Sequence, residues 1–379
     1  MPPISTPPPP REKAITIEAL FLVVLVVRLT AHFALPQPLH GDAWSSFTVA
    51  RGLAAGVWPL ADAGPQSFHA IGYPVVIAAF FALFGASTDV AFGVNLGLAM
   101  ISALLVQGVA RQLGLRDTGQ KMALLGYALW LPGIWDCTLV VRENLGVPLM
   151  LLSAWLALRL LREGGRTDLA LAAGATWGAG VLTSPSLLPL IAGPVLALLL
   201  SRRGWRVPVA AVALAAGAAL MLAPWGWISG ELPGMPASGA FATLAVGSGA
   251  PLPLPPIDSP AMDETLTRLA MFWWPHVPQI GTAGLSRAMI YMRFGEVAQY
   301  ALIFTFGFTG LLAADTVRRQ RAVMGALIAG FWLLGGSGVL GEAYRDPVMP
   351  LLIVLAAAVL SELIYRRPAR RPAMRPLTR

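Results

Sequence analysis

Charged side chains are scarce in this chain of 379 residues. Asp, Glu, Lys and Arg together make up 12% of the sequence, whereas 56% of the residues are hydrophobic. Soluble domains usually carry about 25% charged residues, and the mean hydropathy is +0.68. This composition excludes an ordinary soluble domain and predicts an all-α, polytopic membrane protein.

Cysteine and histidine are nearly absent, which removes whole classes of site. Cys137 is the only cysteine, so neither an intramolecular disulfide nor a cysteine-based metal site can form. The four histidines are scattered without the spacing of helical metal ligands: they are His32, His40, His69 and His276. We therefore expect no cofactor and no metal, although Asp42 and Glu143 could share a divalent ion.

Lysine is also rare, since Lys13 and Lys121 are the only two, and the formal net charge of +8 comes almost entirely from arginine. A nucleic-acid-binding protein would gather that charge on one soluble face. Here the arginines fall in short segments between apolar runs, as the topology of a membrane protein requires. The pattern argues against nucleic acid as a partner.

Apolar runs long enough to cross a bilayer, which takes about 20 residues per helix, fill most of the chain. We predict about ten transmembrane helices, at residues 14–35, 89–110, 121–137, 146–162, 168–183, 187–200, 206–228, 298–314, 321–339 and 347–365. The first run is long for the h-region of a signal peptide and contains Arg28, so it is expected to be retained. The two short runs on either side of Pro185 predict a helical hairpin.

The remaining segments divide the chain around one transmembrane domain, residues 14–365. The Pro-rich N-terminus, residues 1–13, is predicted to be disordered, and residues 366–379 form a basic tail. Two long segments between helices, residues 36–88 and 229–297, are expected on the outer face, where long loops are usually functional or disordered.

Basic residues test this order of helices, because cytoplasmic loops are enriched in Lys and Arg. If the N-terminus is cytoplasmic, every basic cluster falls on the cytoplasmic side: Arg111, Arg116 and Lys121; Arg159, Arg162 and Arg166; Arg202, Arg203 and Arg206; Arg318, Arg319 and Arg321; and the C-terminal tail. The apolar segment 72–85 would break this agreement if it crossed the bilayer. We therefore expect it to lie at the outer interface.

Three carboxylates stand where outer segments meet the bilayer: Asp42, Glu143 and Asp346. Asp42 follows the first helix, and apolar residues then recur every three positions, at Trp44, Phe47, Ala50 and Leu53, which predicts a short helix on the membrane surface. Asp42 would begin that helix, where a carboxylate can alternatively cap free backbone N–H groups. Glu143 precedes the fourth predicted helix, where the helix dipole alone would favour an acid.

Two arginines share that outer face, against the charge bias, and need a carboxylate or a phosphate as partner. Arg142 adjoins Glu143, and Arg345 lies between Tyr344 and Asp346, where a local salt-bridged turn is the alternative. Carboxylates and arginines at bilayer level suit chemistry on a lipid phosphate. An acid can activate an incoming hydroxyl, and an arginine can neutralise a phosphate that leaves.

Five segments in order give the chain a resemblance to a known family. They are HGDAWSSFTVARGLAAG, GYPVVIAAFFALFG, VNLGLAMISALLVQGVARQLG, VVRENLGVPLMLLSAWLALRLL and GAGVLTSPSLLPLIAGPVLALLLSRR, followed late in the chain by YRDPVMPLL. The sequence resembles the membrane-embedded GT-C glycosyltransferases, in their protein O-mannosyltransferase-like and lipid A aminoarabinose transferase-like branches. The resemblance covers residues 14–230 and 340–365.

The resemblance implies an enzyme that passes a sugar, with inversion, from a polyprenyl-phosphate donor to a lipid, glycan or protein acceptor on the non-cytoplasmic face. It implies a bacterial inner-membrane protein among membrane lipids, with both termini cytoplasmic. Asp42 corresponds to the catalytic acid after the first helix and Glu143 to the acid before the fourth. The family's other motifs map substrate-binding roles onto His69, Tyr73 (with Pro74), Arg142, Tyr344 and Arg345.

The sequence departs from the family pattern at the hairpin, where Thr183–Ser184–Pro185 replaces Thr-Arg-Pro. Two other functions therefore remain open: an inactive subunit that keeps the fold, and a transporter. Ion-coupled transporters place ionisable residues near the midplane, whereas the predicted helices here are almost free of acids. Arg28 is the main internal charge, and we expect it to snorkel to the outer face.

Overall fold

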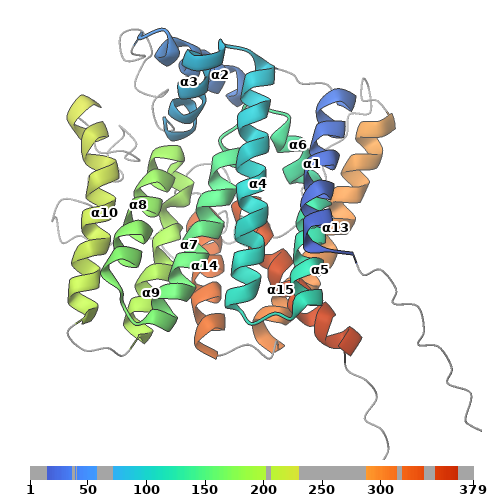
Figure 1. Cartoon of the computed structure of the whole chain (residues 1–379), viewed down its shortest axis with the longest axis vertical. Helices are drawn as coiled ribbons and strands as arrows, with labels where there is room; N and C mark the ends of the chain where they lie inside the picture. The colour runs from blue at the N-terminus through green and yellow to red at the C-terminus, as the bar shows by residue number, and fades with distance from the viewer. Residues whose placement is uncertain are drawn as a thin grey trace, which may run out of the picture.

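The computed structural model describes residues 15–35, 39, 41–57, 71–201, 206–229, 287–313, 318–336 and 346–365. Within these ranges the secondary structure is entirely helical, which confirms the predicted all-α class (Figure 1). The elements are α1 (Ile17–Ala34), α2 (Asp42–Ala54), α3 (Gly72–Phe84), α4 (Thr88–Gln112), α5 (Asp117–Ala128), α6 (Leu131–Cys137), α7 (Glu143–Glu163), α8 (Thr167–Thr183), the 3₁₀ helix η3 (Pro185–Ile191), α9 (Ala192–Leu200), α10 (Arg206–Ser229), α13 (Arg287–Ala313), α14 (Arg318–Gly336), η4 (Asp346–Val348) and α15 (Met349–Tyr365).

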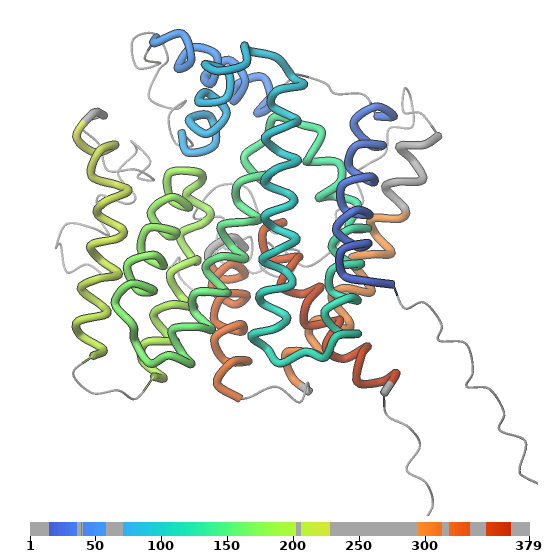
Figure 2. Tube along the Cα trace, viewed as in Figure 1, coloured from blue at the N-terminus to red at the C-terminus, as the bar shows by residue number. Residues whose placement is uncertain are grey.

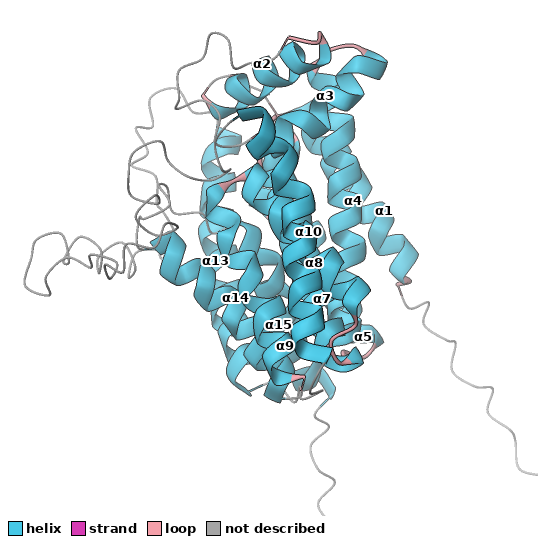
Figure 3. Cartoon of the chain, turned by 90° about the vertical axis from the view of Figure 1, so that its left-hand side faces the viewer, coloured by secondary structure: helices cyan, strands magenta, loops and turns pink. Residues whose placement is uncertain are grey.

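Long helices run side by side as a bundle, and the short helices α2 and α3 lie together across one end of it (Figures 1, 2 and 3). The structure thus places the apolar segment 72–85, as predicted, outside the row of long helices. Its 13-residue helix α3 is too short to span a bilayer core of about 30 Å. We call the end of the bundle that carries α2 and α3 the capped end, and the other the open end.

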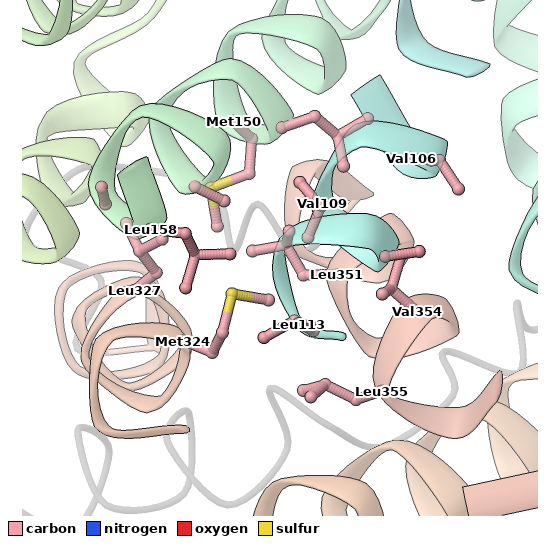
Figure 4. Close-up of a cluster of buried hydrophobic side chains, with 14 of the residues drawn as sticks. Val106, Val109, Leu113, Met150, Leu158, Met324, Leu327, Leu351, Val354 and Leu355 are labelled. Carbon is pink, nitrogen blue, oxygen red and sulfur yellow. The ribbon is translucent and has the colours of Figure 1, made fainter. Parts of the chain in front are cut away.

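The core of the bundle is built around α15. Of the candidate spans, the stretch Asp346–Ile364 is the most buried within the protein, at 72%, whereas Arg206–Trp227 of α10 is only 17% buried. Aliphatic side chains from α4, α7 and α14 meet those of α15 (Figure 4): Val106, Val109, Leu113, Met150, Leu158, Met324, Leu327, Leu351, Val354 and Leu355. The exposed apolar face of α10 is what a helix needs in contact with lipid.

Five described helices are long and apolar enough to cross a membrane: Ile17–Ala34, Thr88–Gln112, Glu143–Glu163, Arg206–Trp227 and Asp346–Ile364. They establish an integral membrane protein, but the predicted count of about ten spans is not confirmed. The expected outer segment 229–297 stays a prediction, and α13 begins within it at Arg287. Its residues 230–286 lie outside the described ranges.

The predicted helix 121–137 is in fact two helices. Helix α5 ends at Ala128 and α6 starts at Leu131, with Pro132 in its first turn. Pro132 has no N–H to bond to the Ala128 carbonyl four residues earlier, and its ring would clash with that carbonyl in a continuous helix, which explains why α5 ends at Ala128. Gln299 of α13 closes the break, because its side chain accepts from the Leu131 N–H at 3.0 Å and donates to the Leu129 carbonyl at 2.7 Å.

The second member of the predicted hairpin, 187–200, also divides, into η3 and α9. Pro185 and Pro189 lie within η3, and neither can donate a backbone hydrogen bond, so the chain winds as a 3₁₀ helix before α9. Trp177 of α8 donates its indole N–H to the Leu188 carbonyl at 2.9 Å. This side-chain hydrogen bond therefore links the two arms of the hairpin.

The open end carries basic turns in which most charges have local partners. Lys121 pairs with Asp117 at 2.6 Å, and Arg159 with Glu163 at 2.6 Å. Arg166 bridges Glu163 and Asp168, and the hydrogen bonds and charge of Asp168 raise the pKa of its guanidinium further above its ordinary value. The described basic residues of the turns predicted to be cytoplasmic therefore lie at one end of the fold.

Arg28 is not at the surface, so the expectation that it snorkels to the outer face is wrong. Its side chain is completely buried in the bundle, and its guanidinium carbon lies 4.7 Å from the ring centroid of Tyr127 on α5. A cation over an aromatic face is stabilised by the ring quadrupole. Helix α1 is thereby attached to α5 through a charged residue rather than an aliphatic one.

Backbone contact between α8 and α10 leads to a first prediction. A Cβ at Gly174 would overlap the Leu214 carbonyl oxygen, and a Cβ at Gly217 would overlap that of Leu171. We expect Gly217→Val to lower the midpoint of thermal unfolding in detergent, since overpacking costs about 1–3 kcal/mol. Gly97→Val is the matched control, because nothing lies within 4 Å of its Cβ position. Equal midpoints for both variants would contradict the close packing.

Candidate active site

A small apolar cluster at the capped end sets the position of α2. Phe47 and Ala50 of α2 are buried against α3, and the rings of Phe47 and Phe81 meet edge to face with centroids 5.3 Å apart. Val140, in the turn before α7, belongs to the same cluster. The cluster therefore fixes the start of α2 relative to the start of α7, although the two are 101 residues apart.

The predicted helix after Asp42 is confirmed as α2, but its buried face differs by one residue from the expected one. Ala43, Phe47 and Ala50 are buried, whereas Trp44 is 51% exposed. Spacings of four and three residues describe this face better than a strict repeat of three. Trp44 consequently points away from the cluster.

Asp42 is the first residue of α2 and does not cap it, so the capping alternative is wrong. The N-cap is Gly41, with a positive φ of 55° that favours glycine, and no side chain caps the helix. The Asp42 side chain is 73% exposed, and its Oδ2 lies 3.8 Å from an Nη atom of Arg142. The carboxylate is therefore accessible and faces a cation.

Arg142 and Glu143 stand together where α7 begins. Arg142 is the N-cap residue, and Glu143 is the first helical residue, half-buried with its Oε2 atom fully covered. Among the described residues, Oε2 has no hydrogen-bond partner. The charges of Asp42 and of Asp346, at the start of η4, both act on this carboxyl group. One arginine and three carboxylates from α2, α7 and η4 thus gather at the capped end.

Asp346 is held by the bundle rather than by its sequence neighbours alone. The Tyr300 hydroxyl of α13 donates to Asp346 Oδ1 at 3.0 Å. Pro347 and Val348 behind it are buried, and Pro347 contacts the position of Gly146 on α7. This short segment brings Asp346 and Pro347, the described part of the late YRDP motif, to the start of α7. Tyr344 and Arg345 of that motif lie outside the described residues, as does His69.

Tyr73 is completely buried, and its hydroxyl donates to Asn95 Oδ1 on α4 at 2.9 Å. Asn95 donates in turn to the carbonyls of Leu139 and Cys137, at 2.8 and 3.3 Å. Burial raises the pKa of the Tyr73 phenol above its ordinary value, so the hydroxyl stays protonated and can serve as the donor. A direct contact between Tyr73 and a substrate would therefore require α3 to move; the substrate-binding role stays a prediction.

This network gives a second prediction. Asn95→Ala would remove the partner of the buried Tyr73 hydroxyl and of the Cys137 carbonyl, which costs roughly 1–3 kcal/mol per group. We expect a lower midpoint of thermal unfolding and weaker docking of α3, measured as faster hydrogen exchange in residues 72–84. Ser102→Ala is the control, because Ser102 lies on the same helix and donates to the Leu98 carbonyl of that helix. Unchanged exchange in α3 would contradict the network.

The α8–η3 hairpin approaches the same site. A Cβ at Gly72 would lie 2.7 Å from the Thr183 hydroxyl, so the start of α3 rests directly on the end of α8. Ser184 shares a 2.7 Å hydrogen bond with the hydroxyl of Ser186. The hairpin that lacks the family's arginine is thus a buried hydroxyl-rich turn beneath α3.

A sequence profile of the dolichyl-phosphate-mannose-protein mannosyltransferases matches residues 68–228. The match includes Tyr73, Arg142 and Glu143, and it begins after Asp42. Among solved structures, the chain is similar to ArnT of Cupriavidus metallidurans bound to undecaprenyl phosphate, with a TM-score of 0.58 and 13% identity over 91% of this chain. The oligosaccharyltransferase of Archaeoglobus fulgidus with a tethered acceptor peptide gives 0.51 and 12% over 92%.

The chain has the GT-C fold. Both solved structures belong to membrane glycosyltransferases of that superfamily, which confirms the resemblance seen in the sequence. The chain spans only 60% of the ArnT chain and 49% of the oligosaccharyltransferase chain. Among the described residues, no three His, Cys, Asp or Glu side chains form a group that could hold a metal ion.

Several residues around the candidate site were not predicted from the sequence. Asn95, Trp130 and Asn144 were not singled out, and Asp346 was placed at bilayer level but given no role beyond a turn with Arg345. Asn95 could have been identified from the sequence, because a polar residue inside an apolar span marks a functional or structural polar contact. Asn144 donates to the carbonyls of Asp136, Leu139 and Val141, at 2.8, 3.0 and 3.2 Å, and so shapes the turn that presents Arg142.

Proposed function

We propose that the protein is an inverting glycosyltransferase that takes a sugar from a polyprenyl-phosphate donor and transfers it to a hydroxyl-bearing lipid, glycan or protein acceptor. The observation that carries the proposal is the meeting of Asp42 with Arg142 and Glu143 at one end of a GT-C bundle. Undecaprenyl phosphate in the ArnT structure supports a lipid-phosphate donor.

Asp42 acts as the general base in this proposal. Its exposed carboxylate takes the proton of the acceptor hydroxyl while the oxygen attacks the anomeric carbon of the sugar. The bond between that carbon and the phosphate oxygen breaks, and the prenyl phosphate leaves with the electron pair. A general base of this kind contributes typically 10²–10⁴-fold to rate.

Arg142 is the described residue best placed to receive the leaving phosphate. Its guanidinium already faces an anion, the Asp42 carboxylate, at 3.8 Å. Such an ion pair in contact with solvent is worth at most about 1 kcal/mol, so an incoming phosphate can displace it at small cost. Charge-assisted hydrogen bonds to phosphate are stronger than neutral ones. Arg345, His69 and Tyr344 are further proposed contacts.

The proposed orientation follows the charges. Basic turns at the open end belong in the cytoplasm with both termini, which puts Asp42 and the capped end on the outer face of a bacterial inner membrane. Asp42 and Glu143 would offer a divalent ion two carboxylate ligands, which make only part of a complete site. The mechanism above uses no metal.

The proposal is tested with purified protein in nanodiscs. We expect transfer or slow hydrolysis of a radiolabelled sugar from a prenyl-phosphate carrier, with release of prenyl phosphate, and no turnover of the matching nucleotide sugar. Nucleotide-sugar turnover would contradict the donor class. Movement of intact prenyl-phosphate sugar across proteoliposomes without bond cleavage would instead favour a transporter. Binding of the donor without either event would favour an inactive subunit.

A further inference from the structure

A small cavity lies inside the bundle beside Glu143. It measures about 20 Å³, and a cavity of at least 10–15 Å³ on this scale can hold one water. Its wall is formed by α4, α5, α6 and α7 together with the break between α5 and α6. Six of the lining residues carry polar side chains: Ser102, Tyr127, Trp130, Asp136, Glu143 and Asn144.

Two of these residues have buried polar atoms without a hydrogen-bond partner among the described residues. One is the indole Nε1 of Trp130, a residue that is 1% exposed, and the other is Oε2 of Glu143. The first is a donor and the second an acceptor when ionised. Leaving such groups unsatisfied costs about 1–3 kcal/mol each, so the fold retains both only if something pairs with them.

Other polar groups at the wall are occupied. Tyr127 donates to the Ala99 carbonyl at 3.3 Å, and Ser102 to the Leu98 carbonyl at 2.9 Å. The Asn144 amide donates to backbone carbonyls of the turn before α7. The two groups left without a partner are therefore the indole N–H of Trp130, a donor, and Oε2 of Glu143, an acceptor. A hydroxyl-bearing molecule satisfies both, since it accepts from one and donates to the other.

We propose that this cavity is a binding site for a single water molecule, which accepts a hydrogen bond from Trp130 Nε1 and donates one to Glu143 Oε2. The cavity size, the polar lining and the complementary unpaired atoms all fit this ligand. A volume of about 20 Å³ matches a water molecule.

The site makes Trp130 a positioning residue for Glu143, a role that rests on the proposed function. The water ties the carboxylate at the start of α7 to the break between α5 and α6, which Gln299 fixes from α13. Glu143 is thereby held from inside the bundle, while Asp42 faces the solvent beside it and Arg142 is half-buried. Trp130 itself would touch neither substrate.

The water site is tested without any enzymatic assay, by NMR of protein carrying ¹⁵N-labelled tryptophan in nanodiscs. We expect the indole N–H of Trp130, assigned by its loss in Trp130→Phe, to show a cross peak to water and to shift in Glu143→Gln. Trp177 is the internal control, because its indole N–H is bonded to the Leu188 carbonyl. A Trp130 signal with no water cross peak and no response to Glu143→Gln would overturn the site.

The positioning role is tested separately by kinetics. We expect Trp130→Phe to lower kcat roughly two- to tenfold, the equivalent of one hydrogen bond, with an unchanged KM for the donor and an altered pH profile. Trp177→Phe should leave all three unchanged. A water cross peak with unaltered kinetics in Trp130→Phe would overturn the positioning role alone. Absence of any wild-type turnover would overturn the proposed function and leave the NMR result standing.

Discussion

Asp42→Asn is expected to reduce sugar transfer by roughly 10²–10⁴-fold, because it removes the proposed general base while keeping the shape of the side chain. The structure predicts little harm to the fold. The Asp42 side chain is 73% exposed, caps no helix and takes part in a single long ion pair with Arg142. Thermal unfolding should therefore be close to that of the wild type.

The measurement is the initial rate of transfer from a radiolabelled prenyl-phosphate sugar at saturating donor. Asp89→Asn is the matched control, since Asp89 is likewise an exposed carboxylate in the first turn of a helix, α4. Its loss should change the rate less than twofold. Transfer at the wild-type rate in Asp42→Asn would remove Asp42 from the mechanism, whatever the overall activity of the protein.

Arg142→Met is expected to raise the KM for the donor roughly 10- to 100-fold, because a hydrogen bond to a charged group contributes about 1.5–3 kcal/mol. Arg142 is the cation nearest to Asp42 among the described residues, and it precedes Glu143 directly. Arg142→Lys should recover part of the loss, since it keeps the charge but not the planar fork that matches a phosphate.

Donor binding can be followed by titration with unlabelled prenyl phosphate, and turnover by the transfer assay. Arg51→Met is the control for charge at the same end of the molecule, because Arg51 is exposed in the last turn of α2. A wild-type KM in Arg142→Met would transfer the phosphate contact to another group, Arg345 being the sequence-based candidate.

The sequence predicted the helical class and the segregation of charge because both follow from local composition. Apolar runs and arginine-rich turns can be recognised in the sequence without knowing which helices contact each other. The start of α2 at Asp42 and the separate position of segment 72–84 followed from length and spacing in the same way. These features are decided by the nature of a bilayer more than by side-chain packing.

Features that depend on distant partners were missed. The break after α5 is stabilised by Gln299, and the phenol of Tyr73 is satisfied by Asn95. Neither partner adjoins its target in sequence. Arg28 shows the opposite error: a position near a helix end suggested an exposed side chain, yet packing against Tyr127 buries it. The cavity beside Glu143 is lined by residues of four helices, so it could not be inferred from the sequence of any one of them.

The break between α5 and α6 also bears on how the protein is made. Its free N–H and C=O groups, at Leu131 and Leu129, are satisfied by a glutamine 168 and 170 residues further along the chain. In hydrocarbon each unsatisfied backbone group costs several kcal/mol. We therefore expect this part of the chain to reach its final structure only after the ribosome has completed α13.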